Sequence, residues 1–274
     1  MCAGLFAVLI LPTTSFAHGD SHERITALTA QIASHPHLPE LLLQRAELHR
    51  QHGEYGLALA DCQAAEKMDT KLIAAQYYRG KILFDAGFFA ESRASLDRFL
   101  AVQRTHSEAF LVRARGSVKL KEFERAAADF SSAIRFAPAA EPDYFVERAQ
   151  ALEAAGKIET ALSGLDEGIA KLGPIVSLQL PAVDLDLKLA RYDEALKRID
   201  LLAAQSSRKE PWLLQRAKIL EKSGRTEEAR MAYANAGVAI NGLPTRLGKS
   251  DSVQAMQHEV SASLERLAAR SPTK

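Results

Sequence analysis

The amino-acid sequence predicts an all-α protein, a right-handed α-solenoid of about six stacked helical hairpins with a capping helix at each end. Three observations lead to this prediction: self-similarity with a period of about 34 residues, columns of small residues at fixed places in the period, and a turn column halfway through it. Self-similarity of this kind is the signature of repeat architectures. Because one hairpin cannot bury its own apolar face, neighbouring hairpins stack to form a continuous core.

The repeated segments begin at Pro39, Ile73, Ser107, Pro142, Val176 and Glu210. They divide residues 39–242 into six copies, 39–72, 73–106, 107–141, 142–175, 176–209 and 210–242. The eighth position is small in five copies and Val183 in the other: Ala46, Gly80, Ala114, Ala149 and Ala217. The twentieth position is small in all six: Ala58, Ser92, Ala126, Ala161, Ala195 and Ala229. Small residues in both columns let two antiparallel helices approach closely, so each copy is predicted to be a helical hairpin.

The fifteenth position of each copy marks the predicted turn between the two helices. It is glycine in four copies, with Lys121 and Ala190 in the other two: Gly53, Gly87, Gly156 and Gly224. Two residues later a large side chain recurs in five copies, with Thr226 in the sixth: Tyr55, Phe89, Phe123, Ile158 and Tyr192. This side chain is expected to fill the gap between the paired helices.

These columns resemble the tetratricopeptide repeat over about 200 residues, from Pro39 to Asn241, and the third copy matches most closely, ending on Pro138. Together with the leader described below, these columns identify the sequence as similar to exported bacterial proteins of this kind. The fifth copy departs from the pattern, because Pro181 falls inside its first helix and Asp186 stands in a usually apolar column. Since proline in a helix removes a backbone donor and kinks it, we expect a bend or an altered superhelical pitch there.

The resemblance implies a non-catalytic scaffold that binds a peptide or protein partner in a concave groove lined by the first helices. The fifth positions of the copies form an apolar stripe in this groove, and the ninth positions form a stripe of polar and charged residues. Such a groove suits an extended peptide or an amphipathic helix. The predicted partner-binding residues are Leu43, Glu47, Tyr77, Lys81, Leu111, Arg115, Val146, Gln150, Leu214 and Lys218. The Lys, Asn and Arg clamp of the chaperone-binding members is not reproduced, and a packed stripe without a ligand is the alternative.

Arginine occupies the seventh position in five of the six copies, as Arg45, Arg79, Arg113, Arg148 and Arg216. A ladder of guanidinium groups can bind carboxylates of a peptide. The more ordinary explanation is pairing inside each hairpin, because the facing column of the second helix holds Asp61 and Asp129. The sequence favours Arg45–Asp61 and Arg113–Asp129 pairs.

Two further helices are expected outside the copies. Asp20 and Glu23 have the spacing of a capping box, which predicts a helix over 21–34 within an N-terminal capping segment, residues 18–38. Apolar residues at helical spacing predict a second cap over 252–270, within the C-terminal segment 243–274.

The N-terminal segment is typical of a secretory leader. An apolar run of about nine residues, 3–11, precedes the small residue Ala17, although no Lys or Arg stands before the run. Residues 1–17 are therefore predicted to be a signal peptide, and the mature protein to be periplasmic or secreted. A membrane span needs roughly 20 apolar residues, so no stable membrane insertion is expected after cleavage.

Composition excludes several functional classes. Thirty-five Lys and Arg against 34 Asp and Glu leave a net charge of +1 over 274 residues, which argues against a nucleic-acid partner. The two cysteines do not make a disulfide framework, and Cys62 is expected to be a buried packing residue. No phosphate-binding loop, zinc-protease helix or nucleophile elbow occurs, so neither enzymatic activity nor a cofactor is predicted.

Six of the eight histidines fall near the start of the mature chain: His18, His22, His35, His37, His49 and His52. Imidazoles commonly bind zinc and copper. Cleavage after Ala17 would make His18 the N-terminus, where its amine and imidazole would chelate a metal together with His22. This gives the alternative function, an exported metal-binding protein; ordinary solvated histidines are the simpler interpretation.

Overall fold

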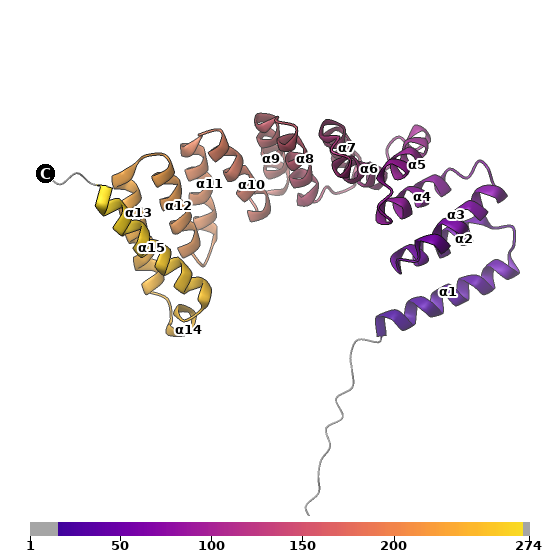
Figure 1. Ribbon diagram of the computed structural model, residues 1–274, viewed down its shortest axis with the longest axis horizontal. Helices are drawn as coiled ribbons and strands as arrows, with labels where there is room; N and C mark the ends of the chain where they lie inside the picture. The colour runs from indigo at the N-terminus through magenta and orange to yellow at the C-terminus, as the bar shows by residue number, and fades with distance from the viewer. Residues whose placement is uncertain (1–15, 271–274) are drawn as a thin grey trace, which may run out of the picture. The chain divides into compact units, whose positions relative to one another are not determined.

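The computed structural model describes the backbone of residues 16–270 and the side chains of residues 22–269. Within these residues the chain forms α-helices and no β-strand, which confirms the all-α prediction (Figure 1). The contacts divide the chain into two units, one ending at Ala137 and one beginning at Pro138. None of the described helices is both long enough and apolar enough to cross a bilayer.

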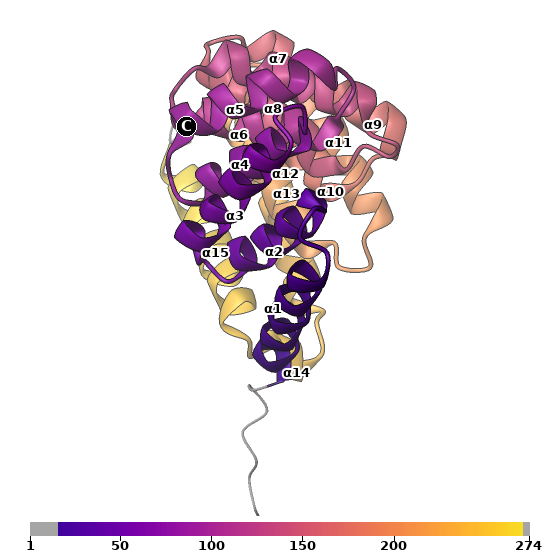
Figure 2. The ribbon, with the colours of Figure 1, turned by 90° about the vertical axis from the view of Figure 1, so that its right-hand side faces the viewer.

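Unit 1 holds the helices of the first three copies together with one helix before them. Its helices are α1 (Phe16–Ser34), α2 (Pro39–Gln51), α3 (Tyr55–Met68), α4 (Ala74–Asp85), α5 (Phe89–Val102), α6 (Ser107–Lys119) and α7 (Phe123–Phe136). The hairpins are α2 with α3, α4 with α5, and α6 with α7, and their first helices are neighbours, α2 beside α4 and α4 beside α6. Both views show α1 alongside α2 (Figure 1, Figure 2).

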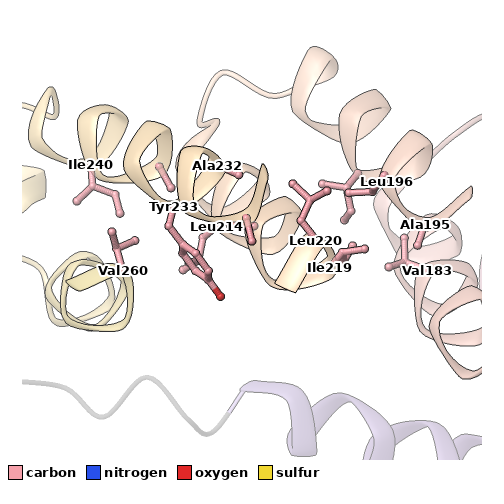
Figure 3. Close-up of a cluster of buried hydrophobic side chains, with 14 of the residues drawn as sticks. Val183, Ala195, Leu196, Leu214, Ile219, Leu220, Ala232, Tyr233, Ile240 and Val260 are labelled. Atoms are coloured by element: carbon pink, nitrogen blue, oxygen red, sulfur yellow. The ribbon is translucent and has the colours of Figure 1, made fainter. Parts of the chain in front are cut away.

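Unit 2 continues the pattern with three more hairpins and two terminal helices. Its helices are α8 (Pro142–Ala154), α9 (Ile158–Leu172), α10 (Val176–Lys188), α11 (Tyr192–Gln205), α12 (Glu210–Lys222), α13 (Thr226–Asn241), α14 (Thr245–Gly248) and α15 (Asp251–Arg270). The core runs from one hairpin to the next and ends where Val260 of α15 packs near Ile240 of α13 (Figure 3). Tyr233 is among the largest fully buried side chains.

Small residues set the distance between the helices of each hairpin. Ala46 and Ala58 are fully buried where α2 meets α3. At the same place in the second copy, a Cβ on Gly80 would lie 2.6 Å from Leu96 Cγ. The interior of a protein is close-packed, so a larger residue in either column pushes the helices apart.

All six turns inside the hairpins use one backbone conformation. In the first, Glu54 N–H donates to the His49 carbonyl (2.9 Å) and Gly53 N–H to the Arg50 carbonyl (3.0 Å), which is the Schellman pattern. The pattern needs a left-handed residue, and Gly53 has φ +74°. Lys121 (φ +60°) and Ala190 (φ +55°) adopt the same conformation without being glycine. These two turns are therefore strained.

Helix α10 of the fifth copy runs without interruption through Pro181. The proline lies beyond the first turn, so its missing N–H removes one bond of the helix ladder. The bend expected from the sequence stays a prediction.

The helix that precedes the copies begins earlier than expected. Because α1 starts at Phe16, Asp20 lies within the helix, so the capping-box prediction at Asp20 and Glu23 is wrong. The helix also extends across Ala17, the expected cleavage point. Ile25 and Ile32 are partly buried, and Arg45 Nη1 donates to Thr29 Oγ1 (3.0 Å). Most of the leader, residues 1–15, lies outside the described residues, and the limits assigned to the end segments stay predictions.

We predict that replacing the two strained turn residues by glycine stabilises the protein. Lys121→Gly and Ala190→Gly should each raise the free energy of unfolding by about 0.5–1 kcal/mol, because a side chain costs roughly that much or more in the left-handed region. Thermal and urea unfolding of each variant measure the change.

The matched control is Gly87→Ala, since a Cβ at Gly87 (φ +84°) would meet no atom within 4 Å. Its only effect is backbone strain, so it should destabilise by about 1 kcal/mol. Equal unfolding energies for all three variants and the unchanged protein would contradict the prediction.

Candidate partner-binding face

The first helices of each unit share one side, formed by positions one, two, five, nine, twelve and thirteen of each copy; we call it the first-helix face. The apolar residues predicted at its fifth position mostly point into the core. Four side chains are nearly inaccessible: Leu43 (3% exposed), Leu214 (4%), Leu111 (6%) and Tyr77 (8%). Val146 is half-buried and Leu180 is 36% exposed. An apolar stripe open to a ligand therefore exists only in the fourth and fifth copies.

The predicted ninth-position residues lie at the surface. Glu47, Lys81, Arg115 and Lys218 are half-buried, and Gln150 is exposed. In unit 1 three first helices are joined here by charge. Lys81 Nζ lies 3.4 Å from Glu47 Oε1 on α2 and 3.3 Å from Glu108 Oε1 on α6, and 5.3 Å above the Tyr77 ring. The ammonium group thus bridges consecutive copies.

A second pair of contacts extends this network in unit 1. Arg50 Nη2 lies 2.7 Å from Glu47 Oε1, and its Nη1 pairs with Asp85 of the next copy. Burial alone would raise the pKa of Glu47, but the hydrogen bond from Arg50 and the charge of Lys81 outweigh it and hold the pKa below its ordinary value. The pKa of Glu108 is lowered in the same way, against burial, by Tyr77 and Lys81. These charges neutralise one another, so this part of the face offers a ligand little net charge.

Unit 2 has an ion pair at the same two positions of consecutive copies, with the acidic and basic residues reversed. Lys188 pairs with Glu153 across α10 and α8, 35 residues apart, just as Asp85 pairs with Arg50 across α4 and α2. Lys218 Nζ lies 2.6 Å from Glu259 of α15, so the last helix already supplies an anionic partner for this lysine. The partner-binding role of all ten predicted residues stays a prediction.

The seventh-position arginines bind acidic side chains or carbonyl groups of the array itself. The predicted pairs are confirmed: Arg45 donates to both carboxylate oxygens of Asp61 (2.8 and 2.6 Å), and Arg113 to both of Asp129 (2.8 and 2.7 Å). Arg113 Nη1 also reaches Asp97 in the preceding copy (2.7 Å). Both edges of its guanidinium are therefore occupied.

The fifth copy also pairs an arginine with an aspartate between its two helices, but from other positions, and the sequence analysis did not predict this pair. Its seventh position is Ala182, and the arginine is Arg198, at the twenty-third position where the first and third copies have aspartate. Arg198 Nε donates to Asp186 Oδ2 (2.7 Å) and its Nη2 to Asp166 Oδ1 of the preceding copy (2.7 Å). Asp186 is 1% exposed, and burial raises its pKa although Arg198 opposes the shift. The sequence signal was an arginine, Arg198, in the column that holds aspartate in the first and third copies, together with the aspartate Asp186 in a usually apolar column.

The histidines do not form a metal centre within the described part of the chain, where no three His, Cys, Asp or Glu residues gather as ligands. His22 is exposed on α1, whereas the side chain of His18 lies outside the described residues. His49 Nδ1 contacts Glu54 Oε2 at 2.5 Å. The metal role of His18 and His22 stays a prediction.

Cys62 is fully buried between the helices of the first hairpin, and burial raises the pKa of its thiol to about 12. A thiol with so high a pKa is not ionised at neutral pH and is a poor nucleophile. This confirms that Cys62 is a packing residue.

Comparison with known proteins agrees with the geometry of the hairpins. The sequence pattern of the tetratricopeptide repeat matches residues 77–141, across the second and third copies. Together with the hairpins described above, this match shows that the fold of the chain is an array of tetratricopeptide repeats. No curated protein matches it at a significant level.

Solved structures match the array over most of its length. The C-terminal part of a TPR repeat-containing protein from Cytophaga hutchinsonii is 16% identical with a TM-score of 0.54, covering 93% of each chain. A tetratricopeptide repeat protein from Parabacteroides merdae is 17% identical with a TM-score of 0.52, covering 89% of this chain and 94% of that one. YrrB, described as a TPR protein with an unusual peptide-binding site, is 18% identical with a TM-score of 0.54, covering 64% and 89%. At these identities the likeness concerns the fold.

We predict that the pair between Arg198 and Asp186 is essential to the stability of unit 2. Arg198→Leu leaves the buried Asp186 carboxylate without its cation and should cost about 3–5 kcal/mol of unfolding free energy. Adding Asp186→Leu to the same chain should recover much of the loss, because no uncompensated charge then stays buried. Urea unfolding of both variants measures this.

The control is Arg230→Leu, which breaks an exposed pair with Glu227 and should cost at most about 1 kcal/mol. A loss for Arg198→Leu no greater than for the control would show that the Asp186 pair contributes little.

Proposed function

We propose that this array is a non-catalytic scaffold that binds a peptide or protein partner along its first-helix face. Arrays of this kind typically work as scaffolds, and a repeat fold carries its function in the surface it presents. The observation that supports the proposal most directly is that adjacent first helices in each unit present one exposed face at fixed positions. The peptide-binding site ascribed to YrrB is consistent with it.

The burial of the fifth positions determines which residues we assign to contact. Changing Tyr77 or Leu111 would disturb the core rather than a ligand, because both side chains are buried. The proposed contacts in unit 1 are therefore the ninth-position residues Glu47, Lys81 and Arg115. In unit 2 they are Gln150, Lys218 and the open apolar stripe.

Site-specific photo-crosslinking tests the face. A benzophenone amino acid placed at Lys119 of α6 or at Gln150 of α8, both exposed, should form an adduct with the bound partner in cell extract. Electrophoresis followed by mass spectrometry detects the adduct and identifies its peptide.

The matched controls carry the same amino acid at Glu91 of α5 and Glu159 of α9, which are exposed on second helices. They should give little or no adduct. Adducts formed at the second-helix positions but not at Lys119 or Gln150 would move the binding surface to the other side of the array.

We also propose that the protein is exported to the periplasm or secreted, on the strength of the apolar run and the small residue Ala17. N-terminal sequencing of the protein purified from its native cells tests this, with His18 expected as the first residue. A mature chain that still begins at Met1 would contradict export by cleavage.

A further inference from the structure

The first-helix face differs between the units at its ninth position. In unit 1 Lys81 lies between two carboxylates, Glu47 and Glu108. The equivalent residue in the fifth copy is Asp184, which is exposed and whose counterparts to those carboxylates are Gln150 and Pro211. Among the described residues Asp184 forms no ion pair. Its charge is therefore not compensated.

A second free carboxylate lies on the same face. Asp143, near the start of α8, is also exposed and unpaired within the described chain. The only cationic side chain at the face positions of the fourth and fifth copies is Lys188, which already forms an ion pair with Glu153. Since α8 and α10 are adjacent, the two free carboxylates share one surface with a net negative charge. Such a surface attracts cationic groups and repels anionic lipid.

Exposed apolar side chains accompany these charges. Leu180 is 36% exposed and Val176 47% exposed, one turn apart on α10. At Val176 the surface continues into an open hollow of about 570 Å³, lined among others by Ile175, Leu202 and Trp212. A hollow of this size holds a large apolar side chain.

We propose that the first-helix face of the fourth and fifth copies binds a partner segment in which a large apolar side chain lies about four residues from a lysine or arginine. The apolar group enters the hollow beside Trp212, and the cation pairs with Asp184. Val176 and Asp184 are eight residues apart on α10, which is roughly 12 Å along the helix. An extended peptide covers that span in about four residues. This inference rests on the proposed function and adds the chemistry of the partner.

A random linear peptide display library, selected on the full chain and on Asp184→Lys, tests the inference. The unchanged chain should enrich peptides in which a large apolar residue and a basic residue are about four residues apart, and Asp184→Lys should enrich an acidic residue where the basic one stood. A synthetic peptide from the first selection should bind Asp184→Lys more weakly by on the order of tenfold or more. Because Trp212 is the only tryptophan, binding should also change its fluorescence.

Glu159→Lys makes the same change of charge on α9 and should leave the affinity of that peptide unchanged. Since Asp184 is exposed and unpaired, its replacement should not lower the melting temperature, which circular dichroism checks.

Selected peptides without basic enrichment, or equal binding to Asp184→Lys, would overturn the inference while leaving a peptide-binding scaffold in place. No enrichment of any peptide would overturn the proposed function as well. An unchanged fluorescence spectrum of Trp212 on binding would show that the apolar side chain of the peptide does not enter the hollow beside it. Dimerisation in sedimentation experiments that Asp184→Lys abolishes would assign the face to a second copy of the chain instead.

Discussion

The close approach of two helices at the eighth and twentieth positions is the constraint on which the structure depends. At the eighth position of the second copy, a Cβ on Gly80 would lie too close to Leu96 of the facing helix. In the first copy, Ala46 and Ala58 are fully buried between the two helices. This approach forces the chain to reverse within a single left-handed residue, which is why all six turns share one hydrogen-bonding pattern. It also directs the larger side chains of the first helix toward the core, so that the fifth position is mostly buried and the exposed positions of the first-helix face are mainly polar.

Charge then sets how one copy follows another. Where the twenty-fifth position of a copy is aspartate, an arginine of the next copy binds it: Asp97 accepts from Arg113, Asp166 from Arg198, and Asp200 from Arg216. The separation is sixteen residues for the first and third pairs, and Thr29 and Arg45 repeat it between α1 and α2. The helix α1 thus stands where the second helix of a preceding copy would stand, which explains why it packs against α2.

The columns of the sequence were sufficient to predict the hairpins, their turns and the Arg45 and Arg113 pairs, because each depends on residues within one period. They were insufficient where burial depends on a neighbouring copy. Leu43 and Leu180 occupy the same column, yet one is 3% exposed and the other 36%. The pairing of Asp186 with Arg198 was missed because each residue, taken alone, departs from its column, and only their distance in space makes them partners. The start of α1 was misjudged because a local capping signal does not exclude a longer helix.

The arginine at the twenty-third position of the fifth copy has a consequence for the order of the copies. Arg198 needs an aspartate at the twenty-fifth position of the copy before it, a condition that the fourth copy meets with Asp166. The first and third copies carry Gln63 and Ser131 there and do not meet it. The copies are therefore not interchangeable at this junction. A fifth copy placed after the first or the third copy would leave Arg198 without the carboxylate that Asp166 supplies.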